Sequence, residues 1–223
     1  MNIEKYDEIR ASLPEGVRLI AVSKFKPAED IALLYQHGHR AFGENHAQEM
    51  KAKHEHLPQD IEWHFIGHLQ TNKIKYIAPY VALIHSVDSF SLLKEVNKAA
   101  AKNNRVIPCL LQFHIADEET KFGFTLEECE EMLQSPDFQE LKNVKIHGVM
   151  GMATFTDDQT QVRQEFHRLH DIFQHLKLQY FSQNPDFKEL SMGMTDDYPI
   201  AIEEGSTLIR IGSAIFGPRN YNV

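Results

Sequence analysis

The feature that most constrains the fold of this chain is an eightfold alternation of short apolar runs with helix-like segments. Strands that are each separated by a helix assemble into a parallel sheet. Eight such units in 223 residues predict one α/β domain over residues 1–223, folded as a (β/α)₈ TIM barrel. A doubly wound open sheet is the alternative. The expected strands lie at 17–24, 39–45, 61–67, 82–88, 106–115, 145–154, 189–195 and 207–217.

The segments between the expected strands carry helix signals. Thr125 and Glu128 have the spacing of a capping box, in which each side chain caps the other residue's backbone. Asp88 or Ser89 is expected to cap a helix over 90–104. The other expected helices include 27–38, 71–80 and 198–205.

The eighth strand has no covering helix of its own. Only residues 218–223 follow it, which is too short a segment for a helix. We expect an N-terminal helix at about residues 3–13 to pack on the barrel in its place.

Composition limits the classes of function. The formal net charge of −9 provides no electrostatic footprint for a nucleic acid. No apolar run approaches the roughly 20 residues of a membrane span, and the N-terminus lacks a signal-peptide core. The two cysteines, Cys109 and Cys129, form no CxxC pair, which favours a reducing, cytoplasmic location.

Glycine and polar residues gather at the expected carboxyl ends of the strands, where barrels of this type carry their chemistry. The most informative segments are "SMGMT" (191–195) and "RIGS" (210–213). Glycine lets a backbone N–H approach an anion closely, and a hydroxyl adds a donor. Because the loops after strands 7 and 8 commonly bind phosphate, these segments predict a phosphate site. Tight turns in a packed barrel are the alternative.

A lysine, Lys24, stands near the apolar end of the first expected strand. Burial lowers the pKa of an ammonium group, which frees the amine to form a Schiff base with an aldehyde. The alternatives are a lysine that reaches solvent or one that pairs with a carboxylate such as Glu44. Lys26, two residues further on, is expected nearer to solvent. An aldehyde and a phosphate held across one barrel mouth describe pyridoxal 5'-phosphate (PLP).

Several stretches of the chain resemble a known family. In combination they closely resemble the YggS/PROSC family of pyridoxal phosphate homeostasis proteins, over about residues 17–217. The family fold is similar to the barrel of alanine racemase and of fold-type III decarboxylases, without the C-terminal β domain. The matching stretches are "LIAVSKFKP", "FGENHAQE", "WHFIGHLQTNK", "SVDS", "KFGF", "HGVMGMA", "LSMGMTDDYPIAI" and "GSTLIRIGSAIFG".

The resemblance implies roles for particular residues of this chain. Lys24 corresponds to the Schiff-base lysine and Arg210 to the residue that faces the pyridine nitrogen. His114 stands where the family often has asparagine, and it is left out of the site. The implied phosphate-binding positions are Ser191, Gly193, Gly212 and Ser213, and the other implied pocket residues are Asn45, His64, Met150 and Met192.

The resemblance implies PLP binding for intracellular vitamin B6 homeostasis rather than catalysis. An arginine at the pyridine nitrogen disfavours protonation there, which weakens the ring as an electron sink. The racemases also use a C-terminal domain that supplies a tyrosine, and we expect none here. Racemisation needs a second acid or base, for which the sequence offers no strong candidate; Tyr198 and His64 are the weak ones. We expect a monomeric carrier that holds PLP on Lys24 and buffers it or delivers it to apo-enzymes; a PLP-dependent racemase of low activity is the alternative.

Other kinds of site fit the sequence less well. His64 and His68 have HxxxH spacing, but they fall on a strand and a turn, so no metal site is expected. Asp117, Glu118 and Glu119 are expected in a solvated loop, without the partner that a glycosidase pair needs.

Overall fold

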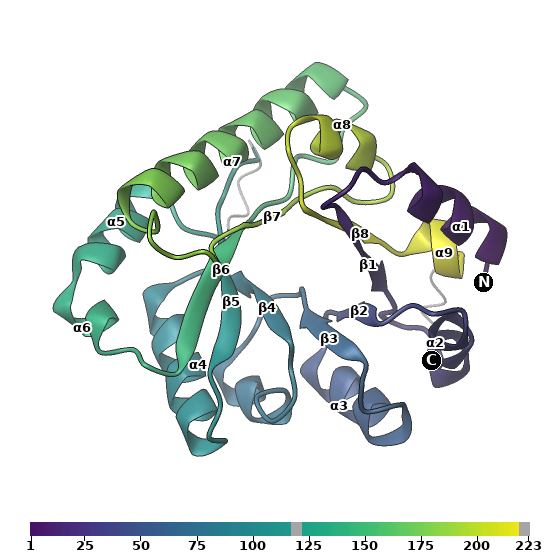
Figure 1. Cartoon of the computed structure of the whole chain (residues 1–223), viewed down its shortest axis with the longest axis horizontal. Coiled ribbons are helices and arrows are strands. Elements are labelled where there is room, and N and C mark those ends of the chain that lie inside the picture. Colours follow the sequence, from purple (N-terminus) through teal and green to yellow (C-terminus); the bar gives the residue numbers. More distant parts are fainter. Residues whose placement is uncertain (117–121, 219–223) are drawn as a thin grey trace.

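The computed structural model describes residues 1–116 and 122–218, and its strands close into a parallel barrel. Each strand pairs with the next, and β1 pairs with β8 to close the ring (Figure 1). The predicted barrel is therefore confirmed, and closure rules out the open sheet. The strands are β1 (Arg18–Val22), β2 (Ala41–Glu44), β3 (Glu62–Phe65), β4 (Leu83–Val87), β5 (Ile107–Gln112), β6 (Val144–Met150), β7 (Glu189–Ser191) and β8 (Leu208–Ile211).

The helices surround the strands, as Figure 1 shows. In the described part of the chain they are α1 (Ile3–Ser12), α2 (Ala28–Gln36), α3 (Ala47–His56), the 3₁₀ helix η1 (Thr71–Tyr76), α4 (Phe90–Lys102), α5 (Leu126–Gln134), α6 (Pro136–Gln139), α7 (Gln159–Gln179), α8 (Tyr198–Glu203) and α9 (Ser213–Phe216).

Helix starts follow the capping signals in the sequence. The Thr125 side chain accepts from the Glu128 backbone N–H at 3.2 Å, and the Glu128 carboxylate accepts from the Thr125 N–H at 2.9 Å. The predicted capping box of α5 is thus confirmed. Ser89, rather than Asp88, caps α4 by accepting from the Leu92 N–H.

Several strands are shorter than the sequence predicts. The strand expected at 207–217 ends at Ile211, and α9 occupies the rest of that run. Ile211 pairs with Ala21, and β1 ends one residue later at Val22. Beyond that point β8 has no neighbouring strand to pair with, so the apolar run continues as a short helix.

The apolar side chains form two layers because successive residues of a strand point to opposite faces. Leu19 and Ala21 of β1 belong to the large core between strands and helices, whereas Ile20 belongs to a smaller cluster inside the barrel. Trp63 is 1% exposed, and burying a side chain of this size contributes more than the about 1.5–3 kcal/mol of an aliphatic residue. The inner cluster consists of Ile20, Leu83, Leu110, Met150 and Leu208.

Helix α1 lies beside α9 at the edge formed by β8 and β1 (Figure 1). Its Tyr6 and Ile9 side chains are buried, and the Asn2 backbone N–H donates to the Ile215 carbonyl at 2.7 Å. The Tyr6 hydroxyl also contacts His39 Nδ1 at 3.1 Å. The first of these bonds attaches the N-terminal helix to the segment that follows β8, and the Tyr6 contact attaches it to the segment that precedes β2.

Candidate functional site

A cavity of about 110 Å³ opens at the carboxyl ends of the barrel strands. Five predicted site residues line it, namely Lys24, Asn45, Arg210, Gly212 and Ser213. They come from loops or strand ends after β1, β2 and β8, which the barrel brings together. The other lining residues are Val22, Lys26, Ile66, Met152, Met194, Thr195 and Gly217.

Two lysines, Lys24 and Lys26, line this cavity. Both follow β1 and both are half-buried, and the placement of Lys26 nearer to solvent stays a prediction. Lys26 Nζ donates to the Pro218 carbonyl at 2.7 Å. The cavity therefore holds two amines, with Lys24 in the turn immediately after the strand.

The carboxylate considered as a partner for Lys24 belongs to a different group of residues. Glu44 is fully buried, and its Oε1 accepts hydrogen bonds from Lys53 Nζ at 2.7 Å and from the Ser23 hydroxyl at 2.6 Å. Its side chain is not among those that line the cavity. Glu44 is thus paired with Lys53 and does not contribute a carboxylate to the cavity.

The Arg210 guanidinium forms the buried floor of the cavity. It donates to Ser191 Oγ at 2.6 Å and to the Gly151 carbonyl at 3.1 Å, and the residue is 4% exposed. Burial lowers its pKa to about 10, which still leaves it charged at neutral pH. A buried cation therefore lines the cavity.

Ser191 and His64 lie deeper than predicted. Ser191 Oγ contacts His85 Nδ1 at 2.8 Å, and His85 Nε2 contacts His64 Nδ1 at 2.9 Å. All three residues are buried in the barrel interior and do not line the cavity. They form a polar series under Arg210, so Ser191 supports the arginine rather than presenting its hydroxyl to a phosphate.

A different pair of hydroxyls lies at the cavity mouth. Ser213 Oγ donates to Thr195 Oγ1 at 3.2 Å, and both residues line the cavity. Beside them, a Cβ on Gly212 would lie 3.0 Å from the Val22 carbonyl oxygen, so glycine lets the two backbones approach closely there. Gly193 has φ of +94°, and a Cβ there would lie 2.6 Å from Ala201 Cβ, so it permits close packing on α8.

The two predicted methionines do not line the cavity. Met150 belongs to the cluster inside the barrel, one layer below, and Met192 points into the outer core. Met152 and Met194 line the cavity instead, each two residues further along the chain. Thr195 was missed in the same way, although it ends the "SMGMT" segment that pointed to this loop.

One buried polar atom of a residue that lines the cavity has no hydrogen-bond partner among the described residues. Asn45 Oδ1 is buried and accepts no hydrogen bond from any residue that the structure describes. A buried acceptor without a partner is unfavourable by roughly 1–3 kcal/mol. Together with two amines, a guanidinium and two hydroxyls, it makes a donor and acceptor set that fits a phosphorylated aldehyde.

The remaining sequence signals do not form a second centre. His68 hydrogen-bonds Asp88 at 3.0 Å on the surface, away from the buried His64. Within 1–116 and 122–218, no three His, Cys, Asp or Glu side chains are grouped to hold a metal ion. The carboxylates at 117–119 lie outside the described residues. Over the same ranges no helix is both long and apolar enough to cross a membrane.

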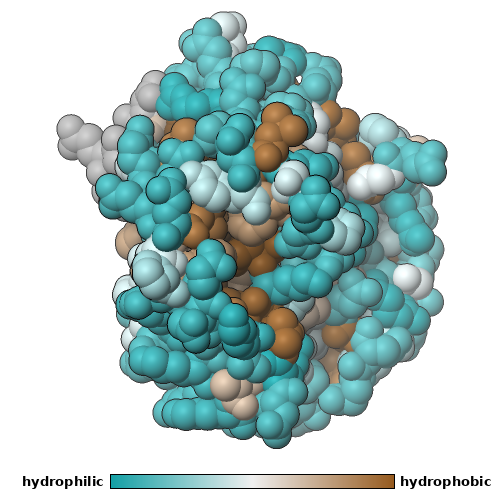
Figure 2. All heavy atoms as spheres, turned by 60° about the vertical axis from the view of Figure 1, so that its left-hand side comes forward, coloured by the Kyte–Doolittle hydropathy of each residue, from teal (hydrophilic) through white to brown (hydrophobic). Residues whose placement is uncertain are grey.

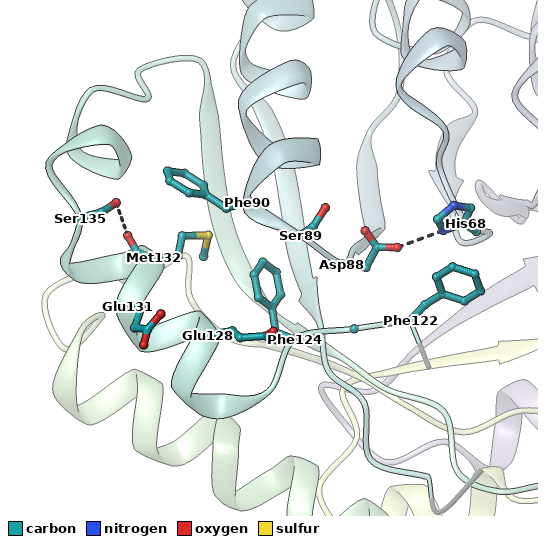
Figure 3. Close-up of a pocket in the computed structure, with 11 residues that line it drawn as sticks. His68, Asp88, Ser89, Phe90, Phe122, Phe124, Glu128, Glu131, Met132 and Ser135 are labelled. Atoms are coloured by element: carbon teal, nitrogen blue, oxygen red, sulfur yellow. Dashed lines mark hydrogen bonds and ion pairs between the residues drawn. The ribbon is translucent and has the colours of Figure 1, made fainter. Parts of the chain in front are cut away.

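A second cavity, of about 610 Å³, lies between the starts of α4 and α5 (Figure 3). Phe90, Phe122 and Phe124 supply apolar walls, and Asp88 and the carboxylates of α5 are acidic. No lysine or arginine is among the described residues that line it. Its size exceeds that of the Lys24 cavity, but the groups that could hold a phosphate and an aldehyde are all in the smaller one.

One face of the protein surface is mostly polar. Figure 2 shows a largely hydrophilic face on which hydrophobic side chains occur in small separate patches. Isolated exposed apolar residues of this kind are ordinary on a protein surface.

Comparisons of sequence place the chain among known proteins. The family model described as "Alanine racemase, N-terminal domain" matches residues 3–220. The pyridoxal phosphate homeostasis protein of Aquifex aeolicus is 42% identical over 92% of this chain and 88% of that protein. The protein of the same name from Escherichia coli K12 is 35% identical over 94% and 88%.

Comparisons of structure agree with those of sequence. PipY of Synechococcus elongatus, solved with PLP bound, superposes with a TM-score of 0.87, 34% identity, and coverage of 96% of this chain and 99% of PipY. An alanine racemase from Bartonella henselae has a TM-score of 0.72 at 16% identity, and the match covers 60% of that chain, so it shows the shared fold. This chain belongs to the alanine racemase N-terminal domain family and, within it, to the pyridoxal phosphate homeostasis proteins.

Proposed function

We propose that this protein binds PLP through a covalent link to Lys24 and serves intracellular PLP homeostasis. The observation that carries the proposal is the meeting of the Lys24 amine, the buried Arg210 guanidinium and the Thr195–Ser213 hydroxyl pair around one cavity. The names of the relatives and the PLP-bound PipY support the same ligand. When bound, PLP supplies a reactive aldehyde that a lysine amine can hold in stored form.

Each group of the cavity has a distinct task in this proposal. Thr195, Ser213 and the backbone at Gly212 bind the phosphate, because hydroxyl and N–H donors at a glycine can surround an anion closely. Arg210 faces the pyridine nitrogen as a permanent cation, which keeps that nitrogen unprotonated. Asn45 Oδ1 accepts a hydrogen bond from the ligand.

The position of the candidate acids and bases supports a carrier rather than a racemase. His64 is sealed inside the barrel, where burial lowers its pKa to about 3. Tyr198 starts α8 and does not line the cavity. Neither side chain is placed to exchange a proton with a molecule held on Lys24, and Arg210 weakens the electron-withdrawing power of the ring.

The proposal extends to the setting of the protein. Cys109 and Cys129 are buried, unpaired thiols, which suits a reducing compartment, and we place the protein in the cytoplasm. There it would act as a monomer that buffers PLP and delivers it to apo PLP-dependent enzymes.

The test compares Lys24→Ala with Lys26→Ala, because both lysines line the cavity. Wild-type protein mixed with PLP should develop a visible absorbance band, and borohydride should fix the ring on Lys24, as mass spectrometry of the peptides would show. Lys24→Ala should lose both signals, whereas Lys26→Ala should keep them. A ring fixed on Lys26 in the wild type would refute the assignment. Lys24-dependent loss of α-deuterium from amino acids at a useful rate would favour the racemase.

A further inference from the structure

A buried ion cluster lies on the outer side of the barrel, directly behind the turn that carries Lys24. Lys53 Nζ donates to Glu44 Oε1 at 2.7 Å, to Glu49 Oε1 at 2.7 Å and to the Ser23 carbonyl at 2.8 Å. An ammonium group has three protons to donate, so these bonds use all of them. We call Glu44, Glu49 and Lys53 the Lys53 cluster.

The Lys53 cluster holds the backbone on both sides of Lys24. On the preceding side, the Ser23 carbonyl accepts from Lys53, and the Ser23 hydroxyl donates to Glu44 Oε1 at 2.6 Å. On the following side, the Phe25 backbone N–H donates to Glu49 Oε1 at 2.7 Å. Hydrogen bonds to ionised groups are about twice as strong as those between neutral groups, so Lys24 lies between two firmly held residues.

The backbone immediately after Lys24 is in an unfavourable conformation. Phe25 has φ of +60°, and Asn104 is the other non-glycine residue with positive φ in the described part of the chain. A residue with a Cβ keeps such a conformation only where its surroundings hold it. The Phe25 side chain is 36% exposed, which limits the support that burial can give. The hydrogen bond from the Phe25 backbone N–H to Glu49 directly stabilises this conformation.

We propose that the Lys53 cluster, acting through Glu49, is a positioning device that fixes the turn so that the Lys24 amine faces the cavity. This inference rests on the proposed function. The members of the cluster do not line the cavity, so they act through the backbone of residues 23–25. Lys53 also neutralises carboxylate charge on the outer side of the barrel, which supports the turn without bringing an anion to the phosphate site.

The test uses Glu49→Ala, with Glu55→Ala as its matched control on the same helix. Glu49 is the partly exposed member of the cluster, with 23% side-chain exposure, so its loss is the one the fold can best tolerate. Glu55 pairs only with Lys51 among the ion pairs of α3, on the surface and away from the turn. Glu49→Ala loses the charge-assisted hydrogen bonds from the Phe25 N–H and from Lys53, of which the first holds the turn, and the apparent affinity for PLP should weaken about tenfold. Glu55→Ala should bind like the wild type.

A second readout separates positioning from general destabilisation. After borohydride treatment, Glu49→Ala should carry part of the ring on Lys26, because the turn no longer directs Lys24 alone into the cavity. Glu49→Gln keeps an oxygen that can accept from the Phe25 N–H, so it should recover most of the affinity and the preference for Lys24. Loss of stability alone would not change which lysine is labelled.

The outcomes separate the two proposals. A folded Glu49→Ala that binds PLP with wild-type affinity, wholly on Lys24, overturns the positioning role and leaves the proposed function intact. Failure of the wild type to bind PLP on Lys24 overturns both. Should Glu49→Ala not fold, Glu49→Leu takes its place, because it fills similar space but has no oxygen to accept from the Phe25 N–H. Unchanged affinity and labelling in that variant would equally overturn the inference.

Discussion

Replacing His64 by glutamine should change how the stability of this protein depends on pH. His64 is the last member of the polar series under Arg210, and its Nε2 is buried without a partner among the described residues. Arginine can only donate, so we assign Ser191 as acceptor from Arg210, with Ser191 then donating to His85 and His85 donating to His64. This direction requires both imidazoles to be neutral, since a protonated ring has no acceptor.

The size of the effect follows from the pKa of His64. Burial, with a smaller repulsion from Arg18 and His39, lowers that pKa from 6.5 to about 3. The unfolded chain therefore takes up a proton first, and stability that is complete above pH 6.5 falls as the pH drops toward 3. Between pH 7.5 and pH 5 this linkage removes about 2 kcal/mol.

The assay is urea unfolding of wild type and His64→Gln, followed by circular dichroism at pH 7.5 and pH 5. The variant should be less stable at pH 7.5, because a fitted interior group has been changed, but the difference should shrink by about 2 kcal/mol at pH 5. Glu44 acts in the opposite direction, because burial raises its pKa to about 7, but it is present in both proteins and cancels. His56→Gln, on the exposed side of α3, should follow the wild type. A constant difference between wild type and His64→Gln would refute the reasoning.

Three further changes test other parts of the structure. Gly148→Ala should lower the free energy of unfolding by more than about 3 kcal/mol in urea, because φ is +151° and the new Cβ would lie 1.8 Å from the Glu189 carbonyl oxygen; wild-type stability would show that β6 and β7 do not approach so closely. Removal of residues 1–12 takes away the buried Tyr6 and exposes the surface beneath it, so the protein should unfold or lose many degrees of Tm, and an unchanged Tm would contradict the role of α1. Thr195→Val should weaken PLP affinity about tenfold in an absorbance titration at unchanged Tm, because a hydrogen bond to a charged phosphate is lost; unchanged affinity would place the phosphate elsewhere.

The barrel could be predicted from the sequence because its signal is repeated eight times. A single misread strand end, such as the one after Ile211, leaves the number and order of the units unchanged. The carboxyl ends of parallel strands meet at one end of the barrel, so the strand pattern alone could bring Lys24 and Arg210 to a common cavity.

The individual site residues were harder to predict, because two separate facts decide which side chain reaches the cavity. The first is direction, which alternates along a strand: Ser191 points inward and Met192 outward, so a site that includes both mixes the two faces. The alternation could have corrected this error. The second fact is depth. Met150 and Met152 share a direction, but only Met152 is far enough along the chain to line the cavity.

Depth could not be predicted from the sequence, since it depends on how the strands are offset around the barrel and how many layers of side chains fill the interior. The Lys53 cluster was out of reach for a related reason. Glu44 was considered as a partner for Lys24, and it does lie on β2, the neighbour of the strand that precedes Lys24. Glu44 pairs with Lys53 instead, because α3 packs on the outer side of β2 and places the Lys53 ammonium group beside the Glu44 carboxylate.

The arrangement of charge around the cavity also favours storage of PLP over a reaction catalysed with it. The chain carries a formal net charge of −9, yet two lysines and an arginine line the cavity, and Glu44, which precedes the lining residue Asn45, is bound to Lys53 on the other side of the strand. Such a cavity attracts a phosphorylated anion while the rest of the surface does not. The Arg210 cation also opposes protonation of the ring, because a positive charge lowers the pKa of a basic nitrogen nearby. Groups that strengthen binding of the ligand thus weaken its capacity to accept electrons, which is the combination that a carrier of a reactive aldehyde needs.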